Sequence, residues 1–301
     1  MDERMNEAAV VRHQEFECDG PVEIIVWVGA GRLDVQLGQD EGNAPMVAVQ
    51  VRQDETARAP WNAGLTGLLG WLGEYTGQLS PGELTSAAIR ATLIEFAERR
   101  LTVQSPREMP LRTVPLVVTV TAPTGSTVTA RAGSADVTVD GLTARLDVTT
   151  GSGELRVQRC EGPAEIRTGS GDVRLGSVVG ALRARTGSGG VDVIALDGAG
   201  TVHTGSGDIR IGAVSDDLQA RTGSGDLTVS DATAGQLELT TGSGQLRVGI
   251  HTGVLAEIDM SSGSGQARSE LPFGAPPADG FARLRVRGRT GSGEAVVTPA
   301  A

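Results

Sequence analysis

The chain has 301 residues, of which 43 are glycine and 3% are aromatic, and its formal net charge at pH 7 is −11. Such an acidic chain lacks the basic balance of nucleic-acid binders, and nothing in its charge attracts it to an anionic membrane. The two cysteines, Cys18 and Cys160, form neither a CxxC motif nor a disulfide framework. We therefore expect no nucleic-acid partner, and we expect Cys160, which falls at an inward corner of a repeat, to be a buried thiol.

The N-terminal residues 1–13 are expected to be a disordered leader. They lack the apolar h-region of a signal peptide, and no run of about 18 apolar residues occurs in the chain. We therefore predict a cytoplasmic location and no stable membrane insertion.

Residues 14–54 alternate apolar and polar side chains, which predicts strands. Val26 and Val28 precede the tripeptide Gly29-Ala30-Gly31, and Leu33 and Val35 follow it. This arrangement matches the glycine corners of the later repeats. We therefore expect 14–54 to supply N-terminal strands of the same structure.

Residues 55–100 change to a helical pattern and predict an inserted helical hairpin. A first, glycine-rich helix is expected over 61–78. The second helix begins with a capping box, in which Ser80 is the N-cap, Pro81 occupies N1 and Glu83 occupies N3. Its apolar stripe and its basic C-terminal end consist of Ile89, Leu93, Phe96, Arg99 and Arg100.

Two roles fit this hairpin. It could cap the open end of a repeat structure, because an uncapped end exposes unpaired strand edges. It could also dock a protein partner, another copy or a membrane surface. The residues that would form the docking surface are Trp61, Leu65, Leu68, Leu69, Trp71, Leu72 and Tyr75.

Residues 101–301 return to strand patterns and contain a repeated glycine-rich motif. Thr-Gly-Ser-Gly begins at Thr150, Thr168, Thr186, Thr204, Thr222, Thr241 and Thr290, with related tetrapeptides at Ala132 and Ser262. The spacing is 18 residues over most of the array and becomes longer only near its C-terminal end. Each repeat holds two short strands of period 2 separated by turns.

A period close to 20 residues is typical of stacked repeats. We expect one elongated domain, a right-handed single-stranded parallel β-helix with two strands in each coil of about 18 residues. Like residues would stack on like, and the glycines would adopt φ > 0 at sharp corners. The alternative is an antiparallel meander, but too little apolar sequence remains elsewhere to cover its single long sheet. No capping helix follows the last repeat, so the C-terminal end is expected to be bare.

The array offers little for catalysis or metal binding. His13, His203 and His251 are scattered, and no nucleophile elbow or dinucleotide fingerprint occurs. The glycine turns differ from calcium-binding β-rolls, because the turn that alternates with them lacks the motif. Enzymes that cleave polysaccharides on a β-helix need wider coils and a cleft. We therefore predict no enzymatic activity, no cofactor and no metal.

Charged residues are predicted to form columns on the outer surface. One column consists of Asp136, Glu154, Asp172, Asp208, Asp226 and Glu294, and arginines follow two residues later in most repeats. Another column, just before the glycine turn, consists of Arg131, Arg167, Arg185, Arg221 and Arg289, with His203 among them. The columns could bind an anionic polymer or a glycan, or they could simply neutralise one another. The lack of aromatic residues along the array makes glycan binding less favoured.

A strand with the sequence LVVTVTAP, followed by iterated Thr-Gly-Ser-Gly-Asp coils, resembles the putative-adhesin β-strand repeat family, also called the toastrack domain. The resemblance covers residues 15–52 and 101–298. It implies a right-handed β-helix without agreed catalytic residues. Some members of this bacterial family are secreted or are parts of envelope proteins, and others are cytoplasmic.

The functional prediction from the sequence is a non-catalytic scaffold. It would bind a protein partner, or a second copy as a homo-oligomer, through the hairpin or the ends of the rod. The alternative is an adhesin-like protein that binds a cell-envelope polymer or glycan through the stacked charges.

Overall fold

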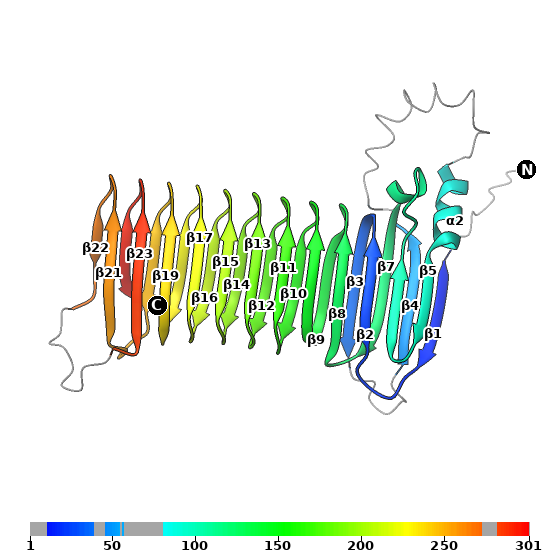
Figure 1. Cartoon of the computed structure of the whole chain (residues 1–301), viewed down its shortest axis with the longest axis horizontal. Coiled ribbons are helices and arrows are strands. Elements are labelled where there is room, and N and C mark those ends of the chain that lie inside the picture. The colour runs from blue at the N-terminus through cyan, green and yellow to red at the C-terminus, as the bar shows by residue number, and fades with distance from the viewer. Residues whose placement is uncertain (1–10, 39–45, 55, 57–80, 273–281, 301) are drawn as a thin grey trace, which may run out of the picture.

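The computed structural model describes residues 11–38, 46–54, 56, 81–272 and 282–300. These residues form an elongated rod of strands that lie side by side, with one α-helix near the N-terminal end (Figure 1). Each coil contributes one strand to sheet 1 and one to sheet 2, and the two sheets enclose a single core of buried Val, Leu, Ile and Ala.

Sheet 1 begins at the N-terminal end of the rod with strands that pair as neighbours. Their order is β1 (Arg12–Glu17), β4 (Met46–Gln53), β7 (Pro115–Pro123), β3 (Ala30–Gly38), the first part of β9 (Asp136–Thr150), β10 (Leu155–Cys160), β12 (Val173–Val178), β14 (Val191–Leu196), β16 (Ile209–Val214), β18 (Leu227–Ala232), β20 (Leu246–Ile250), β24 (Ala295–Pro299) and β22 (Ala267–Ser269).

Sheet 2 runs along the other side of the core. Its order is β5 (Leu93–Ala97), β6 (Arg100–Gln104), β2 (Glu23–Val28), β8 (Ser126–Ala132), the second part of β9, β11 (Ala164–Thr168), β13 (Leu182–Thr186), β15 (Gly200–Thr204), β17 (Leu218–Thr222), β19 (Gly235–Thr241), β23 (Leu284–Thr290) and β21 (Ala256–Ser262).

The repeats stack in parallel, as the sequence predicted. In sheet 2, Thr168 of β11 lies opposite Thr186 of β13, which lies opposite Thr204 of β15. Neighbouring strands of the array run in the same direction in both sheets. The solenoid is therefore confirmed, and the antiparallel meander is wrong for the array.

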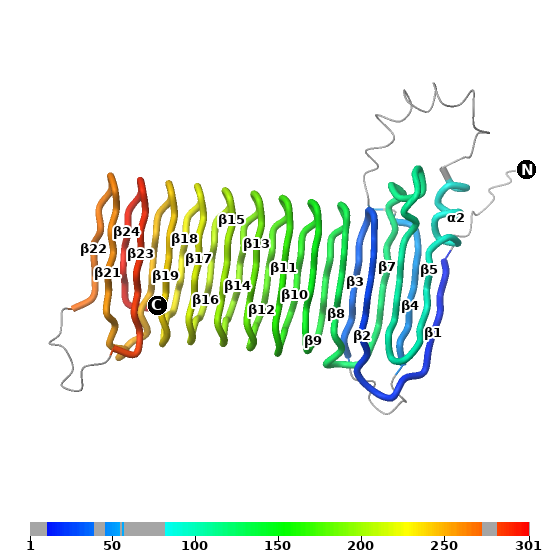
Figure 2. The backbone as a smooth tube through the Cα atoms, viewed as in Figure 1, coloured from blue at the N-terminus to red at the C-terminus, as the bar shows by residue number. Residues whose placement is uncertain are grey.

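The order of the coils in space differs from their order in the chain at both ends (Figure 2). The last coil, β23–β24, lies between the coils β19–β20 and β21–β22. At the other end, β2–β3 lies between β6–β7 and β8–β9. The outermost C-terminal coil is consequently formed by β21 and β22, not by the last residues of the chain.

The glycines of the repeated motif are needed for close approach rather than for a left-handed backbone. Positive φ occurs at Gly31 of the early corner and at glycines outside the motif, such as Gly141 and Gly198, so the predicted φ > 0 is wrong for the Thr-Gly-Ser-Gly corners. A Cβ on Gly169 would lie 2.4 Å from the carbonyl oxygen of Gly151, and one on Gly171 would lie 1.8 Å from that of Gly153. Glycine is required because successive corners touch through their backbones.

The threonine of the motif is buried and ties successive coils together. The hydroxyl of Thr222 accepts a hydrogen bond from the N–H of Gly225 at 3.1 Å and donates one to the carbonyl of Gly207 in the preceding coil at 2.9 Å. Thr204 and Thr241 donate equivalent bonds to the coils before them. The motif is therefore explained by backbone hydrogen bonding inside the solenoid.

The N-terminal end of the rod is closed by antiparallel strands and a short helix. Helix α2 (Pro81–Ala91) buries Ala88 and Ile89 and lies against β4 and the 3-10 turn η1 (Leu111–Thr113). Strand β4 pairs with β1 and β7, and β5 pairs with β6, all in the antiparallel sense. The rings of Phe16 in β1 and Phe96 in β5 stack with centroids 5.2 Å apart, which covers this end of the core.

The second predicted helix is real but shorter than expected. It ends at Ala91, and residues 93–97 form β5, so a helix continuing to Arg100 is wrong. The hydroxyl of Thr92 donates to the carbonyl of Ala88 at 2.9 Å, and Glu98 and Arg99 adopt positive φ in a tight turn. Ile94 lies opposite Val103 of β6 and is buried there, so pairing with β6 makes this segment a strand instead of a continued helix. The first predicted helix, 61–78, lies outside the described residues.

Candidate functional site

The predicted arginine column exists on the outer face of sheet 2. Arg167, Arg185, His203 and Arg221 lie opposite one another on the successive strands β11, β13, β15 and β17, and all four side chains are exposed. The column is interrupted before and after this group. Thr149 separates Arg131 from Arg167, and Thr240 separates Arg221 from Arg289.

The arginines of this column are poorly compensated by acids. Arg167 forms an ion pair with Glu165. Within the described ranges, Arg131, Arg185, Arg221 and Arg289 form no ion pair. Arg183, two residues before Arg185, forms none either, although Glu165 of β11 lies opposite it. We call Arg167, Arg183, Arg185, His203 and Arg221 the arginine strip.

Three arginines in the middle of sheet 1 behave differently. Arg156 pairs with Glu154 at 3.0 Å, and Arg174 pairs with the same carboxylate at 2.9 Å. Arg210 pairs with Asp208 at 2.7 Å. The interpretation that charges neutralise one another therefore holds for this part of sheet 1 and for Arg167, and fails for Arg185 and Arg221.

The acidic column of sheet 1 also serves the backbone. Asp136 accepts the N–H of Glu154 in the next coil at 2.9 Å, and Asp208 accepts that of Asp226 at 2.9 Å. Asp226 does the same for Gln245 at 2.8 Å. These carboxylates satisfy N–H groups at the corners where the ladder is interrupted, so the column is explained without a ligand.

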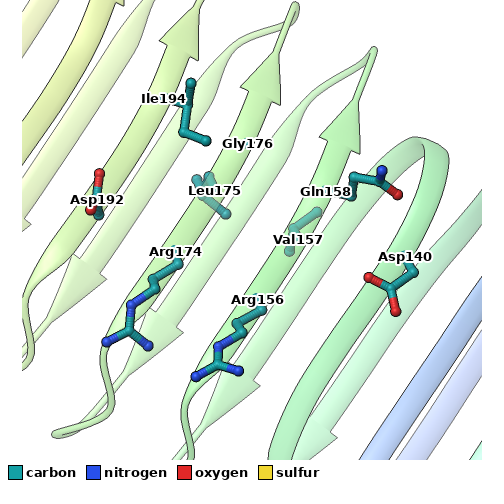
Figure 3. A pocket seen from close by; sticks show the side chains of 9 residues that line it. All are labelled: Asp140, Arg156, Val157, Gln158, Arg174, Leu175, Gly176, Asp192 and Ile194. Atoms are coloured by element: carbon teal, nitrogen blue, oxygen red, sulfur yellow. The ribbon is translucent and has the colours of Figure 1, made fainter.

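A shallow hollow of about 380 Å³ lies on sheet 1 (Figure 3). It forms because Gly176 stands between Gln158 and Ile194 on neighbouring coils, and Ile194 is 69% exposed. Arg156, Arg174, Asp140 and Asp192 surround it, with Val157 and Leu175 beneath. The lining contains no histidine, cysteine, serine or threonine, and its arginines already pair with acids. Its two carboxylates, Asp140 and Asp192, stand on β9 and β14, which are three strand steps or roughly 14 Å apart, farther than the carboxylate pair of a glycosidase.

The histidines lie apart, as the sequence predicted. His13 contacts Glu15, His251 contacts Asp231, and His203 belongs to the arginine strip. No group of three or more His, Cys, Asp or Glu among the described residues is arranged to hold a metal. No helix in the described ranges has the length and apolar character needed to cross a membrane.

The buried thiol expected at Cys160 is confirmed. The side chain has no exposed surface, its Sγ donates to the carbonyl of Gly162 at 3.3 Å, and burial raises the pKa of the thiol above its usual value. A raised thiol pKa disfavours the reactive thiolate. Cys160 is therefore a packing residue.

Sequence reasoning missed one aromatic residue beside the arginine column. Trp27 of β2 lies opposite Arg131 of β8, and the guanidinium of Arg107 stacks over its ring at 3.9 Å. The signal was present, because Trp27 and Arg131 each stand two residues before the first glycine of a corner, Gly29 and Gly133. The premise that no aromatic residue accompanies the column therefore fails at this end.

The predicted docking surface on the hairpin lies outside the described residues. It consists of Trp61, Leu65, Leu68, Leu69, Trp71, Leu72 and Tyr75. Its role stays a prediction.

Comparisons with known proteins agree with this architecture. A family model described as Toastrack DUF4097 matches residues 116–211 and 198–298. No curated protein matches the sequence. A solved structure described as a putative lipid binding protein from Parabacteroides distasonis ATCC 8503 is similar, with a TM-score of 0.51, 12% identity and 96% of each chain covered. A putative adhesin from Bacteroides fragilis NCTC 9343 gives a TM-score of 0.38 at 10% identity, with 96% of this chain and 98% of that one covered.

Proposed function

The chain belongs to the Toastrack DUF4097 family, and we propose that it is a non-catalytic interaction module whose arginine strip holds an extended acidic polymer. The observation that carries this proposal is a contrast between two groups of arginines. Arg156, Arg174 and Arg210 of sheet 1 form ion pairs with carboxylates, whereas Arg185 and Arg221 of sheet 2 form none with a described residue.

Like charges within the strip are unfavourable in the free protein, because Arg167 and Arg185 lie on adjacent strands and only Arg167 forms an ion pair. Neighbouring strands are about 4.8 Å apart, and at that distance two unit charges repel by roughly 1 kcal/mol in water. Carboxylate or phosphate groups bound along the strip would remove this repulsion and accept hydrogen bonds from the guanidinium groups. The strip therefore favours an acidic ligand over a neutral one.

The shape of the strip favours a polymer over a small molecule. The side chains stand on an exposed face at regular steps along four consecutive strands, and the hollow described above lies on sheet 1, not beside them. Each contact on such a surface is weak because water screens it. A chain of repeated acidic groups gains affinity by making several of these contacts at once.

Charge reversal at Arg185 tests the proposal. The probe is polygalacturonate, a linear polymer of carboxylated sugars, with dextran as a neutral polymer. We expect polygalacturonate to bind at low salt, to dissociate as salt rises and to bind Arg185→Glu about tenfold more weakly. Dextran should not bind.

Arg247→Glu is the matched control, because Arg247 is an exposed arginine of sheet 1 that forms no ion pair within the described residues. It changes the net charge by the same amount and should bind polygalacturonate as the unaltered protein does. Equal losses in the two variants would mean that net charge, not the strip, controls binding. No binding by the unaltered protein at low salt would reject the function for carboxylated polymers.

A second candidate function is docking of a protein partner through residues 61–75. The observation in its favour is that α2, the antiparallel strands and the Phe16–Phe96 stack already cover the N-terminal end of the core. The apolar residues of 61–75 are therefore not needed as its cap. Replacing 57–79 by a glycine–serine linker should leave thermal stability nearly unchanged and abolish partner recovery, whereas general unfolding would support the capping role.

The cytoplasmic location stays a prediction.

A further inference from the structure

The outer face of sheet 2 carries an aromatic residue where the fold does not require one. Trp27 follows the same inward–outward alternation as its neighbours, with Val26 and Val28 buried and its own side chain half-buried on the outside. It is one of only three tryptophans in the chain. Packing of the core therefore does not account for it.

The segment after β6 places Arg107 directly over this ring. The N–H of Ser105 donates to the carbonyl of Trp27 at 2.8 Å, and the hydroxyl of Ser105 accepts the N–H of Gly29 at 3.0 Å. These bonds fix the start of the segment on β2. The guanidinium of Arg107 then stacks at 3.9 Å from the centre of the Trp27 ring.

A stacked guanidinium is held in one plane while its N–H edges stay free to donate. Arg107 is exposed and also donates a hydrogen bond to the side-chain oxygen of Gln104 at 3.4 Å. Arg131 stands next to Trp27 on the adjacent strand. Neither arginine forms an ion pair with a described residue, although Glu108 follows Arg107 directly in the chain.

We propose that Trp27, Arg107 and Arg131 form an anchor for a single oxyanion, a carboxylate or a phosphate, at the N-terminal end of the arginine strip. The proposal deepens the proposed function and rests on it in one respect, since it assigns the anchor to the end group of the same polymer. Two guanidinium groups, one of them already ordered by the ring, would grip the oxyanion through paired N–H donors.

The anchor and the strip lie in one line. The strands β2, β8, β9 and β11 carry Trp27, Arg131, Thr149 and Arg167 in the same register. Three steps separate Trp27 from Arg167, which is roughly 14 Å at the usual strand spacing. A long acidic chain could therefore reach both, whereas a short fragment bound at the anchor would not reach Arg185 or Arg221.

Tryptophan fluorescence gives a direct test. In a Trp61→Phe/Trp71→Phe background, Trp27 is the remaining tryptophan. The short probes are digalacturonate for a carboxylated sugar and glycerol 3-phosphate for a phosphate. We expect a saturable change in Trp27 emission with at least one of them, and the two arms show which oxyanion the anchor prefers.

Arg107→Gln should weaken binding of that probe about tenfold, because a charge-assisted pair of hydrogen bonds is lost. Arg107→Lys keeps the charge but loses the planar stack, so it should restore only part of the affinity. No emission change with either probe, or unchanged affinity in Arg107→Gln, would overturn the anchor. Circular dichroism confirms that each variant keeps its β structure.

Arg185→Glu separates this inference from the proposed function. It should leave affinity for the short probes unchanged and weaken binding of long polygalacturonate. If short probes bind at Trp27 while Arg185→Glu does not affect the polymer, the anchor stands and the strip proposal fails. If the reverse is found, the strip stands and the anchor fails.

Discussion

At the scale of single residues, the most frequent motif of the chain is structural. Thr222 bonds to its own turn and to the preceding coil, and Gly171 allows two backbones to touch. Such residues recur because each coil repeats the same backbone contacts. The residues that point to a ligand are those that the backbone does not explain, namely Arg185, Arg221 and Trp27.

Thr222→Val should destabilise the rod although it preserves the shape of the side chain. It leaves the N–H of Gly225 and the carbonyl of Gly207 without their partner in a buried site, at a cost of roughly 2 kcal/mol. The measurement is the midpoint of urea unfolding. Thr228→Val, on the outer face of β18, is the control and should change the midpoint little. Equal shifts in both variants would contradict the role of the hydroxyl.

Asp34 offers a test of pH dependence. Burial raises the pKa of its carboxyl above the usual value of 3.8, although Arg32 and Arg52 oppose the shift. The folded state therefore holds this proton more tightly than the unfolded state, so Asp34 lowers stability as pH rises from the unfolded value of 3.8 through its folded pKa, and the loss stays constant at higher pH. Asp34→Asn should raise the unfolding temperature at pH 7, and the difference should vanish below about pH 4. A lower unfolding temperature at pH 7 would mean that attraction to the arginines dominates.

At the scale of elements, the repeated coils could be predicted because Thr-Gly-Ser-Gly marks each corner. Strand β5 could not, since Leu93 to Ala97 continues an apolar spacing that also fits the preceding helix, and only pairing with β6 decides between the two. The order of the last coils was hidden for another reason. Every coil offers the same backbone edge, so similarity between coils does not reveal which two are neighbours. The 28-residue spacing between Gly263 and Gly291 was the only sign of the change.

The arginine column was predictable as a set of positions, but its function was not. Periodicity alone places Arg156 and Arg185 in equivalent-looking columns. Which arginine forms an ion pair depends on side-chain geometry. Arg156 of β10 reaches Glu154, which directly precedes that strand, whereas Arg185 reaches no described carboxylate. The Trp27 stack was partly visible, but Arg107 comes from a segment 80 residues further along the chain.

The closure of the N-terminal end can be tested at Phe96. Phe96→Ala removes the ring that stacks on Phe16 and exposes the end of the core, which should cost roughly 2 kcal/mol for a partly buried aromatic residue. Leu93→Ala on the same strand is the control, because Leu93 is 41% exposed and should matter less. Hydrogen exchange of β5 and β6 should accelerate in Phe96→Ala and not in Leu93→Ala. Unchanged exchange in both variants would show that the stack does not close this end.

At the scale of the whole molecule, charge is distributed unevenly although the net charge is acidic. Sheet 2 carries the uncompensated arginines along its middle, while acids lie at both ends of the rod. Glu257 and Asp259 project from β21, the outermost C-terminal strand of sheet 2, and Glu15 and Glu95 are exposed on β1 and β5. Charged edge strands disfavour pairing with another molecule. We therefore expect self-association, where it occurs, to avoid the ends.

Replacing the acids of β21 should allow two molecules to associate through their C-terminal ends. Ile258 and Met260 are only partly buried there, and on the outer side of β21 no described strand pairs with it. Glu257 and Asp259 pair with Arg285 and Arg287 of β23, and these charged groups would lose water if a second molecule paired with β21. A Glu257→Thr/Asp259→Thr variant keeps a strand-forming sequence and removes the two carboxylates from that edge. Sedimentation velocity should show dimers of the variant at concentrations where the unaltered protein and a Glu238→Thr control, altered on the inner strand β19, stay monomeric. A monomeric variant, or end-to-end dimers of the unaltered protein, would show that these acids do not prevent association at this end.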